Sequence, residues 1–448
     1  MTIRHALRRL LPLLLVLAGI PAQGEGPLYV GGEPSLSGGF VTGTPVSGKP
    51  FHWDPTKFPL TYWTDQGNLG GLSKTGTSGA DALVQQAFQV WQDVATASIT
   101  FSKATDLGGN VTASNAQAVI DAVSDCSTLP GPPAGTVAKP RTIIYDDSSG
   151  SIMLALGDDP NVTLGFADAV CFSGDGTDDY FNRGYAVLNG KGITSLNAST
   201  ELKPVMIHEF GHMIGLDHSQ INLACLGFCG AADSEGLPTM FPILVDGAAM
   251  STPATDDIAG VSALYPTASF STSTATITGN VYFSDGITPA QGFNVIARRA
   301  TDPRVTAVSN VSGYLFTGDA GNPLVQDPTL GTPSPFGSHD PSLIGVYEIP
   351  GLPPGDYTVE VEGIHNTGTF AFVGGSGLNP IGYLGFEFNL LADCSPLFLS
   401  NTASLATCNA ADKRTITVSA GQTKTDTDII LIGTTASLPR YDAYEDGP

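Results

Sequence analysis

Three of the seven histidines fall within His208-Glu209-Phe210-Gly211-His212-Met213-Ile214-Gly215-Leu216-Asp217-His218. On a helix, residues four apart project from one face about one turn apart, so His208 and His212 are expected side by side. His218 cannot join them on the same helix, because six further residues turn it away from that face. Gly215 favours a chain reversal, since glycine adopts the left-handed conformation that ends a helix. The spacing therefore predicts that three imidazoles converge on one point.

Three neutral imidazoles are a ligand set typical of catalytic zinc, because they leave the fourth tetrahedral position open for water. Zinc lowers the pKa of that water to about 7 and polarises a substrate carbonyl. Glu209 is expected beside the water as general base and then general acid. The stretch thus predicts Zn²⁺ at His208, His212 and His218, with peptide-bond hydrolysis as the reaction. The alternative is a chance motif on a solvated helix, which the further Gly and His at the right spacing disfavour.

The extended pattern is the metzincin signature, and other segments resemble the matrixin branch of that clan. Ser219 follows the third histidine, as in matrixins. Residues 237–242 resemble the Met-turn, which implies that Met240 lies beneath the zinc; a methionine that only fills a core gap is the alternative. Residues 255–266 resemble the last helix of matrixin catalytic domains, and the first strand and helix are matched at 58–63 and 87–91. The resemblance covers residues 51–266 and implies an α+β catalytic domain with a mixed sheet and few helices.

Three features depart from the family pattern. The interval between His218 and Met240 is longer than in matrixins, so cleavage specificity is not transferred. Pro242 stands where related metzincins carry a tyrosine, so no tyrosine ligand is expected. The first cysteine, Cys126, lies inside the catalytic domain, so latency through a pro-segment cysteine is not expected.

Periodicity predicts a helix and several strands in this region. Residues 80–95 carry an apolar helical stripe, expected in the core, of Leu83, Val84, Ala87, Phe88, Trp91 and Val94. Alternating or β-branched runs predict strands at 58–65, 97–101, 142–145 and 185–188.

The N-terminal segment has the features of an export signal peptide. Residues 1–24 combine Arg4, Arg8 and Arg9 with an apolar run and small residues near a cleavage point. The run is short for a membrane span, so a secreted protein without a membrane anchor is expected. Residues 25–50 are rich in Gly, Pro and Ser and are interpreted as an extended leader, with room to occupy the active-site cleft.

Without the signal the chain has 16 Lys+Arg and 42 Asp+Glu, a formal net charge of 16 − 42 = −26. Such a polyanion is not expected to bind nucleic acid. Two acidic clusters are read as solvated turns, with structural Ca²⁺ as the alternative, namely Asp146 with Asp147, and Asp175 with Asp178 and Asp179. A second, structural zinc is disfavoured, since only His52 remains in this domain.

Six cysteines in an exported chain indicate disulfides. Sequence position favours Cys126 with Cys171, Cys225 with Cys229, and Cys394 with Cys408.

The sequence changes character after Pro266. Residues 267–275 form a predicted Ser/Thr-rich linker, and 276–432 are dominated by predicted strands at 276–283, 292–298, 345–349, 357–361 and 414–418. Residues 277–281 and 347–359 resemble a carboxypeptidase regulatory-like (transthyretin-like) β-sandwich; any secreted sandwich is the alternative. We expect an all-β spacer or targeting module, followed by a disordered acidic tail at 433–448.

The leading hypothesis is a secreted zinc metalloendopeptidase acting on extracellular proteins or peptides, with endo action implied by the resemblance. One alternative is a non-catalytic exported adhesion or binding protein on a metzincin scaffold. Glu209 argues against it, since a structural site needs no general base. An esterase or amidase using the same water is the third reading. Oligomeric state is left open.

Overall fold

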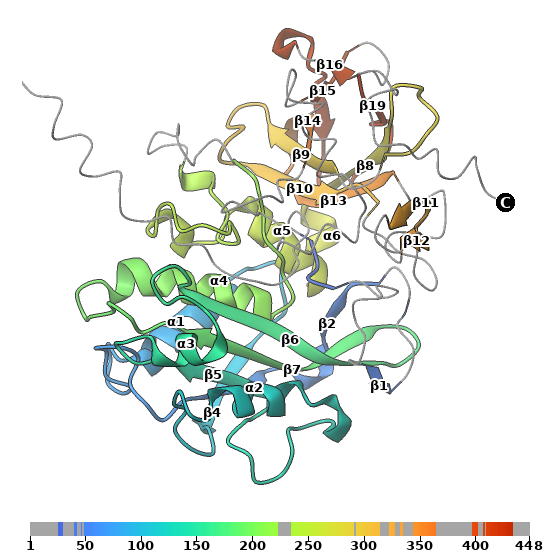
Figure 1. Cartoon of the computed structure of the whole chain (residues 1–448). Helices are drawn as coiled ribbons and strands as arrows, with labels where there is room; N and C mark the ends of the chain where they lie inside the picture. Colours follow the sequence, from blue (N-terminus) through green and yellow to red (C-terminus); the bar gives the residue numbers. More distant parts are fainter. Residues whose placement is uncertain are drawn as a thin grey trace, which may run out of the picture.

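Figure 1 shows the chain as a computed structural model. The structure describes residues 26–29, 40–42, 46, 49–222, 234–290, 293–313, 322–327, 332–334, 343, 345–363, 397–401, 406–407 and 409–432. The predicted signal peptide, most of the leader, the acidic tail and the cysteine pairs at 225/229 and 394/408 lie outside these residues.

A seven-stranded mixed sheet forms the centre of the N-terminal region. Its strands are β1 (Phe40–Thr42), β2 (Phe51–Trp53), β3 (Leu60–Thr64), β4 (Phe101–Asp106), β5 (Arg141–Tyr145), β6 (Gly165–Gly174) and β7 (Asp179–Leu188). The order is β1-β6-β7-β5-β3-β4, with β2 also paired to β7. Only β6 and β7 run antiparallel among these pairs. The predicted mixed sheet is therefore present.

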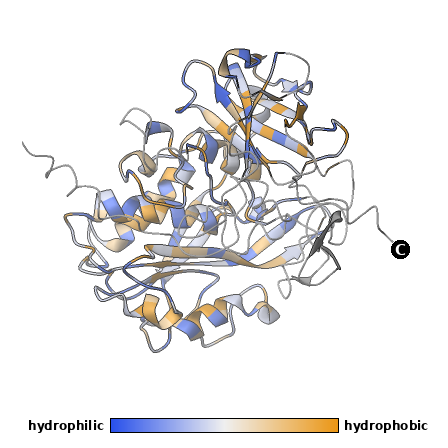
Figure 2. Ribbon diagram, turned by 45° about the horizontal axis from the view of Figure 1, so that its top comes forward, coloured by the Kyte–Doolittle hydropathy of each residue, from blue (hydrophilic) through white to orange (hydrophobic). Residues whose placement is uncertain are grey.

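Helices cover both faces of this sheet. On one face α1 (Ala80–Gln92) and α4 (Lys203–Met213) share an apolar cluster with Ile143. On the other face α2 (Ala116–Ser124) and α3 (Ser151–Leu156) pack with Ile144. Neighbouring residues of β5 thus serve opposite layers, because successive strand side chains alternate in direction. Figure 2 shows the strands running between the two helical layers.

Most predicted elements of this region are found, with shifted ends. All six residues of the predicted stripe on the first helix are buried. The strand predicted at 97–101 begins only at Phe101, because Ala97 and Ser98 pair with Pro266 and Tyr265 instead. The predicted disulfide between Cys126 and Cys171 is present.

The C-terminal region is mostly β-strand. One sheet has the order β10-β9-β14-β15-β16, with β17 beside β14, and a second has β13-β8-β18, with β19 beside β8. The strands are β8 (Ala275–Tyr282), β9 (Phe293–Arg299), β10 (Ala307–Val311), β13 (Val346–Leu352), β14 (Gly355–Gly363), β15 (Leu397–Leu399), β16 (Ala406–Thr407), β17 (Ile416–Val418), β18 (Thr423–Lys424) and β19 (Ile429–Ile430). A separate pair joins β11 (Asn322–Asp327) to β12 (Thr332–Ser334). The predicted linker contains a short helix, α6 (Phe270–Ser273).

The two regions are packed together rather than strung apart. Helix α5 (Thr255–Leu264), the last of the N-terminal region, contacts β10 and β13 (Figure 1). One apolar cluster includes Phe241 and Met250 of the N-terminal region together with Val295 and Tyr347 of the C-terminal region. The side chains on either side of this boundary thus belong to one core. No helix among the described residues has the length and apolar character needed to cross a membrane.

Candidate metal centre

Helix α4 carries the first two histidines and ends as its sequence predicts. Pro204 lies in its first turn, where a missing N–H costs no hydrogen bond. Gly215 has φ of 100°, in the left-handed region, and its N–H donates to the carbonyl of His212. A β-carbon on Gly215 would stand 2.8 Å from the ring of Phe181, so glycine is required by space as well as by conformation. The chain then turns back and brings His218 toward the helix.

The three imidazoles converge. Nε2 of His212 lies 3.1 Å from Nε2 of His208 and 3.1 Å from Nε2 of His218. All three side chains are buried, and their ligand atoms lie within 4.8 Å of one another. Three nitrogens at about 2.0–2.1 Å from one tetrahedral zinc ion would be roughly 3.4 Å apart, close to what is found. The predicted meeting point is therefore confirmed.

Hydrogen bonds at the opposite ring nitrogens prepare these Nε2 atoms for a metal. Nδ1 of His208 donates to the Thr239 carbonyl at 2.8 Å, and Nδ1 of His212 donates to the Leu216 carbonyl at 2.9 Å. A neutral ring that donates from Nδ1 presents a lone pair at Nε2. Burial also lowers the pKa of His208 well below its ordinary value and that of His212 to about 4. Neutral imidazoles with facing lone pairs fit a dication, and Zn²⁺ suits this all-nitrogen donor set.

Met240 is fully buried in the turn that follows η6 (Ser234–Gly236), and its sulfur lies close to Gly211 of α4. Its predicted place beneath a zinc ion stays a prediction. Its carbonyl accepts the backbone N–H of Ser219 at 2.9 Å, next to the third ligand. The carboxylate of Asp257 holds this turn, accepting N–H groups from Thr239 at 2.8 Å, Met240 at 2.9 Å and Ala254 at 2.6 Å. The turn thus supports both His208, through Thr239, and the segment that carries His218.

Glu209 follows the first ligand, His208, on α4. Its side chain is 1% exposed, and its Oε1 has no hydrogen-bond partner among the described residues. It packs against Gly165 at the start of β6, where an added β-carbon would lie 2.9 Å from Cγ of Glu209. Burial raises the pKa of Glu209 well above its ordinary value. A dry carboxyl group next to a metal ligand, with a free acceptor atom, is suited to proton transfer.

Four of the five acidic residues considered for calcium accept hydrogen bonds from protein groups, three of them from nearby residues and Asp179 from a distant segment. Asp146 accepts the N–H groups of Ile152 and Met153 at the start of α3, and Asp147 accepts from Ser149 and Ser151. In the second cluster, Asp175 accepts from the N–H groups of Thr177 and Asp178, and Asp179 from that of Val46. Among the described residues, a group of three or more His, Cys, Asp or Glu side chains with ligand atoms close enough to share a metal ion is found at the three histidines. Calcium binding stays a prediction.

Two residues of the site were not predicted from the sequence. Asp257 occupies the third position of a helix, which signals a capping role, but its bonds to Thr239 and Met240 span long sequence separations. Gly165 gave no signal, since its role depends on the side chain that faces it.

The family comparison agrees with this geometry. The family model described as Matrixin matches residues 52–266, a range that contains all three histidines, Glu209 and Met240. Comparison with curated proteins finds no match for the chain.

Proposed function

Residues 52–266 form a matrixin catalytic domain, a zinc metalloendopeptidase with a buried three-histidine site, and from this premise we propose that Glu209 is its general base. The observation that carries the proposal is the buried Oε1 of Glu209, which lacks a partner and lies one residue from a ligand. We propose further that the enzyme is exported and cuts extracellular proteins or peptides.

Bound zinc supplies a Lewis acid that polarises the scissile carbonyl and lowers the pKa of water. Glu209 takes the proton of the attacking water as the oxygen–carbon bond forms, and holds it on its carboxyl group. When the carbon–nitrogen bond breaks, Glu209 gives the proton to the leaving amine and returns to the carboxylate. The Thr239 and Leu216 carbonyls hold two of the rings in place throughout.

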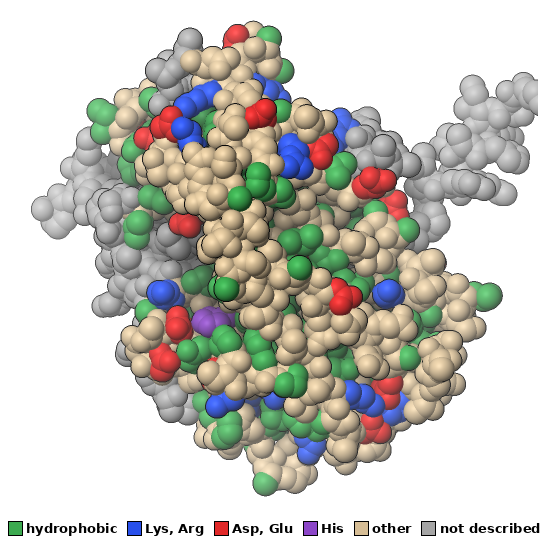
Figure 3. All heavy atoms as spheres, turned by 180° about the vertical axis from the view of Figure 1, so that it is seen from behind, with side chains coloured by type: hydrophobic (Ala, Val, Ile, Leu, Met, Phe, Trp, Pro, Cys, Tyr) green, Lys and Arg blue, Asp and Glu red, His purple; other side chains and the backbone are tan. Residues whose placement is uncertain are grey.

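Export is supported by the predicted signal at residues 1–24 and by the disulfide between Cys126 and Cys171, since such bonds persist in oxidising compartments. Acidic and basic side chains are interspersed on the face in Figure 3, and the chain has a formal net charge of −23. A chain with this net charge is suited to solubility outside the cell rather than to nucleic acid.

For residues 276–432 we propose a carboxypeptidase regulatory-like β-sandwich. Support comes from the sequence at 347–359, which spans β13 and β14, and from two sheets whose buried residues meet in one apolar cluster. We also propose that the domains begin and end where the sequence analysis predicts.

The decisive experiment compares Glu209→Gln with His212→Ala for zinc content and for cleavage of casein. We expect Glu209→Gln to bind one zinc per chain and to lose roughly 10²–10⁴-fold in kcat, the range for removal of a general acid–base. We expect His212→Ala to lose zinc as well, because two ligands remain.

Glu348→Gln is the matched control, since Glu348 is exposed on β13, and it should leave both readouts unchanged. An unimpaired Glu209→Gln enzyme would refute the assignment. A parent protein that binds zinc but cleaves no peptide would favour the non-catalytic binding protein.

A further inference from the structure

Four consecutive residues follow the third zinc ligand, and each is tied to the C-terminal region. They are Ser219, Gln220, Ile221 and Asn222, all buried. Ser219, Gln220 and Asn222 use hydrogen bonds and Ile221 an apolar contact. The partners come from β9, β10, β14 and the turn between β9 and β10.

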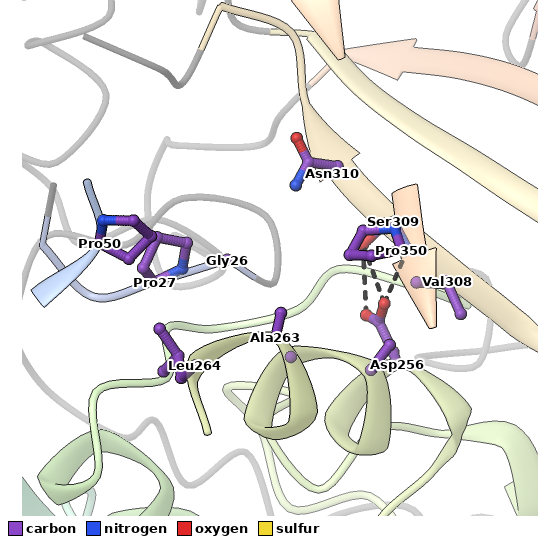
Figure 4. A pocket seen from close by; sticks show the side chains of 12 residues that line it. Gly26, Pro27, Pro50, Asp256, Ala263, Leu264, Val308, Ser309, Asn310 and Pro350 are labelled. Atoms are coloured by element: carbon purple, nitrogen blue, oxygen red, sulfur yellow. Dashed lines mark hydrogen bonds between the residues drawn. The ribbon is translucent and has the colours of Figure 1, made fainter. Parts of the chain in front are cut away.

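Ser219 is linked through a single carboxylate. Its Oγ donates to Oδ2 of Asp256 on α5 at 2.5 Å, and Oδ1 of Asp256 accepts the N–H of Ser309 on β10 at 2.7 Å. Ser309 Oγ also reaches Oδ2 of Asp256 at 3.2 Å. Figure 4 shows Asp256 bonded to Ser309 at one side of a pocket between α5 and β10. The residue next to His218 is therefore two hydrogen bonds from the second region.

Gln220 reaches the second region directly. Its Nε2 donates at 2.7 Å to Oε1 of Glu362 on β14, and the same oxygen accepts from Nδ2 of Asn294 on β9 at 3.0 Å. The amide of Gln220 is thus fixed by two neighbouring strands of one sheet.

Ile221 makes the apolar contact. Its side chain is 1% exposed and forms a cluster with Ile296 of β9 and Ala307 of β10, which are also buried. This cluster has no other member among the described residues. Burial of Ile221 therefore depends on the C-terminal region.

Asn222 completes the attachment in an uncommon conformation. Its φ is 64°, in the left-handed region. Its Nδ2 donates to the carbonyl of Arg304 at 2.7 Å, and its Oδ1 accepts from Nη1 of Arg298 at 2.8 Å. Arg298 is in turn paired with Glu360 of β14. A non-glycine residue holds positive φ where its surroundings impose it, and here most of the surroundings belong to the second region.

We propose that the C-terminal β region is a positioning element of the metal centre, acting through residues 219–222 to hold His218. His208 and His212 are fixed by their helix and by carbonyls of the N-terminal region, whereas His218 lies on irregular chain after the reversal. The chain immediately beyond it is held by the Met240 carbonyl at the N–H of Ser219, and by the second region through the side chains of residues 219–222. Loosening that contact should free His218 first and speed metal loss. This inference does not depend on the role of Glu209.

The test truncates the same side chain at two places in the full-length protein. Ile296→Ala removes the partner of Ile221. Ile429→Ala makes the identical deletion in β19, which belongs to the other sheet of the same region, and both isoleucines are fully buried. Zinc release into excess chelator and the visible spectrum of the Co²⁺-substituted protein are recorded well below the unfolding midpoint.

We expect Ile296→Ala to release zinc at least about 10-fold faster than Ile429→Ala and to change the Co²⁺ spectrum, because the geometry of one ligand relaxes. Equal release rates and unchanged spectra in the two variants would overturn the proposal.

A second pair keeps the test decisive if Ile296→Ala does not fold. Asp256→Ala breaks the link between Ser219 and Ser309, whereas Asp256→Asn keeps an oxygen for the Ser309 N–H. We expect fast zinc release from Asp256→Ala and a rate closer to the parent for Asp256→Asn. Release at the parent rate from Asp256→Ala would contradict the inference.

Discussion

The sulfur of Met240 lies 2.2 Å from the point that a β-carbon on Gly211 would occupy. Gly211 stands on α4 between the two zinc-binding histidines, and Met240 belongs to the turn whose neighbouring carbonyl, from Thr239, holds the ring of His208. The absence of a side chain at one residue thus lets the ligand helix and the supporting turn approach closely. We expect the distance between them to affect the orientation of His208, because the Thr239 carbonyl accepts from its ring.

Gly211→Ala should therefore push the helix and the turn apart. Met240 is fully buried, so its sulfur has little room to move, and overpacking of this kind costs about 1–3 kcal/mol. We expect lower stability together with weaker zinc binding, measured by thermal unfolding and by competition with a chelator. Gly211→Ala combined with Met240→Ala should recover part of the zinc affinity, since the clash is removed. A single variant that matches the parent in both measurements would show that the close approach is unimportant.

Gly165→Ala should separate turnover from metal binding. The added β-carbon would lie 2.9 Å from Cγ and 3.0 Å from Oε1 of Glu209, so the carboxyl group must shift. The three atoms nearest to it all belong to Glu209 and none to an imidazole. We expect kcat to fall on the order of 10–10²-fold, because a general base displaced by about 1 Å transfers protons poorly, with one zinc still bound. Loss of zinc with preserved turnover per bound metal would contradict this account.

The disulfide between Cys126 and Cys171 closes a loop of 45 residues between α2 and β6. Replacing both cysteines by serine should lower the free energy of unfolding by about 3–4 kcal/mol, since the unfolded chain gains freedom. Arg183 should keep the loop folded, because its guanidinium donates to the carbonyls of Val123, Asp125 and Gly131. Urea unfolding at saturating zinc measures the loss, and casein cleavage should be unchanged. A change below about 1 kcal/mol would mean that the loop is held by Arg183 alone.

The metal site can be predicted from the sequence because its three ligands are close together along the chain. Helical spacing brings His208 beside His212, and Gly215 permits the reversal that returns His218. The apolar stripe of α1 can be predicted for the same reason, since the residues that it buries lie on one face of a single helix. Strand limits were less accurate where pairing is distant, as at Ala97, which bridges to Pro266.

The supports of the site depend on partners far along the chain. The contact of Gly165 with Glu209 and the bond of Asp256 to Ser309 involve residues that look ordinary in isolation. For the same reason the second region was expected to be a spacer or targeting module. Its shared core with the catalytic domain emerges only from tertiary packing, because Ile296 has the pattern of any buried strand residue.

Asp168 on β6 is a half-buried residue whose carboxyl group is bound to the N-terminal segment. Its Oδ1 accepts from the hydroxyl of Tyr29 at 3.2 Å. Burial raises the pKa of Asp168 to about 7, and the bonds from Tyr29 and from the Ala169 N–H offset this only in part. In the unfolded chain the pKa of an aspartate is about 3.9. The folded state therefore binds the proton more tightly than the unfolded state.

Asp168→Asn should consequently stabilise the protein at high pH. The contribution of Asp168 to stability is fully present below about pH 4 and is lost as the pH rises through about 7, with a slope of at most about 1.4 kcal/mol per pH unit in that window. An amide carries no charge but still accepts the Tyr29 hydroxyl, so the variant should equal the parent at pH 4 and exceed it at pH 8. The difference between variant and parent is measured by urea unfolding across this range at saturating zinc. Protonation that is linked to metal binding is common to both proteins and cancels in the difference. Asp121→Asn on α2 is the exposed control for loss of one charge. A stability difference that stays flat or falls with pH would show that Asp168 is ionised in the folded protein at little cost.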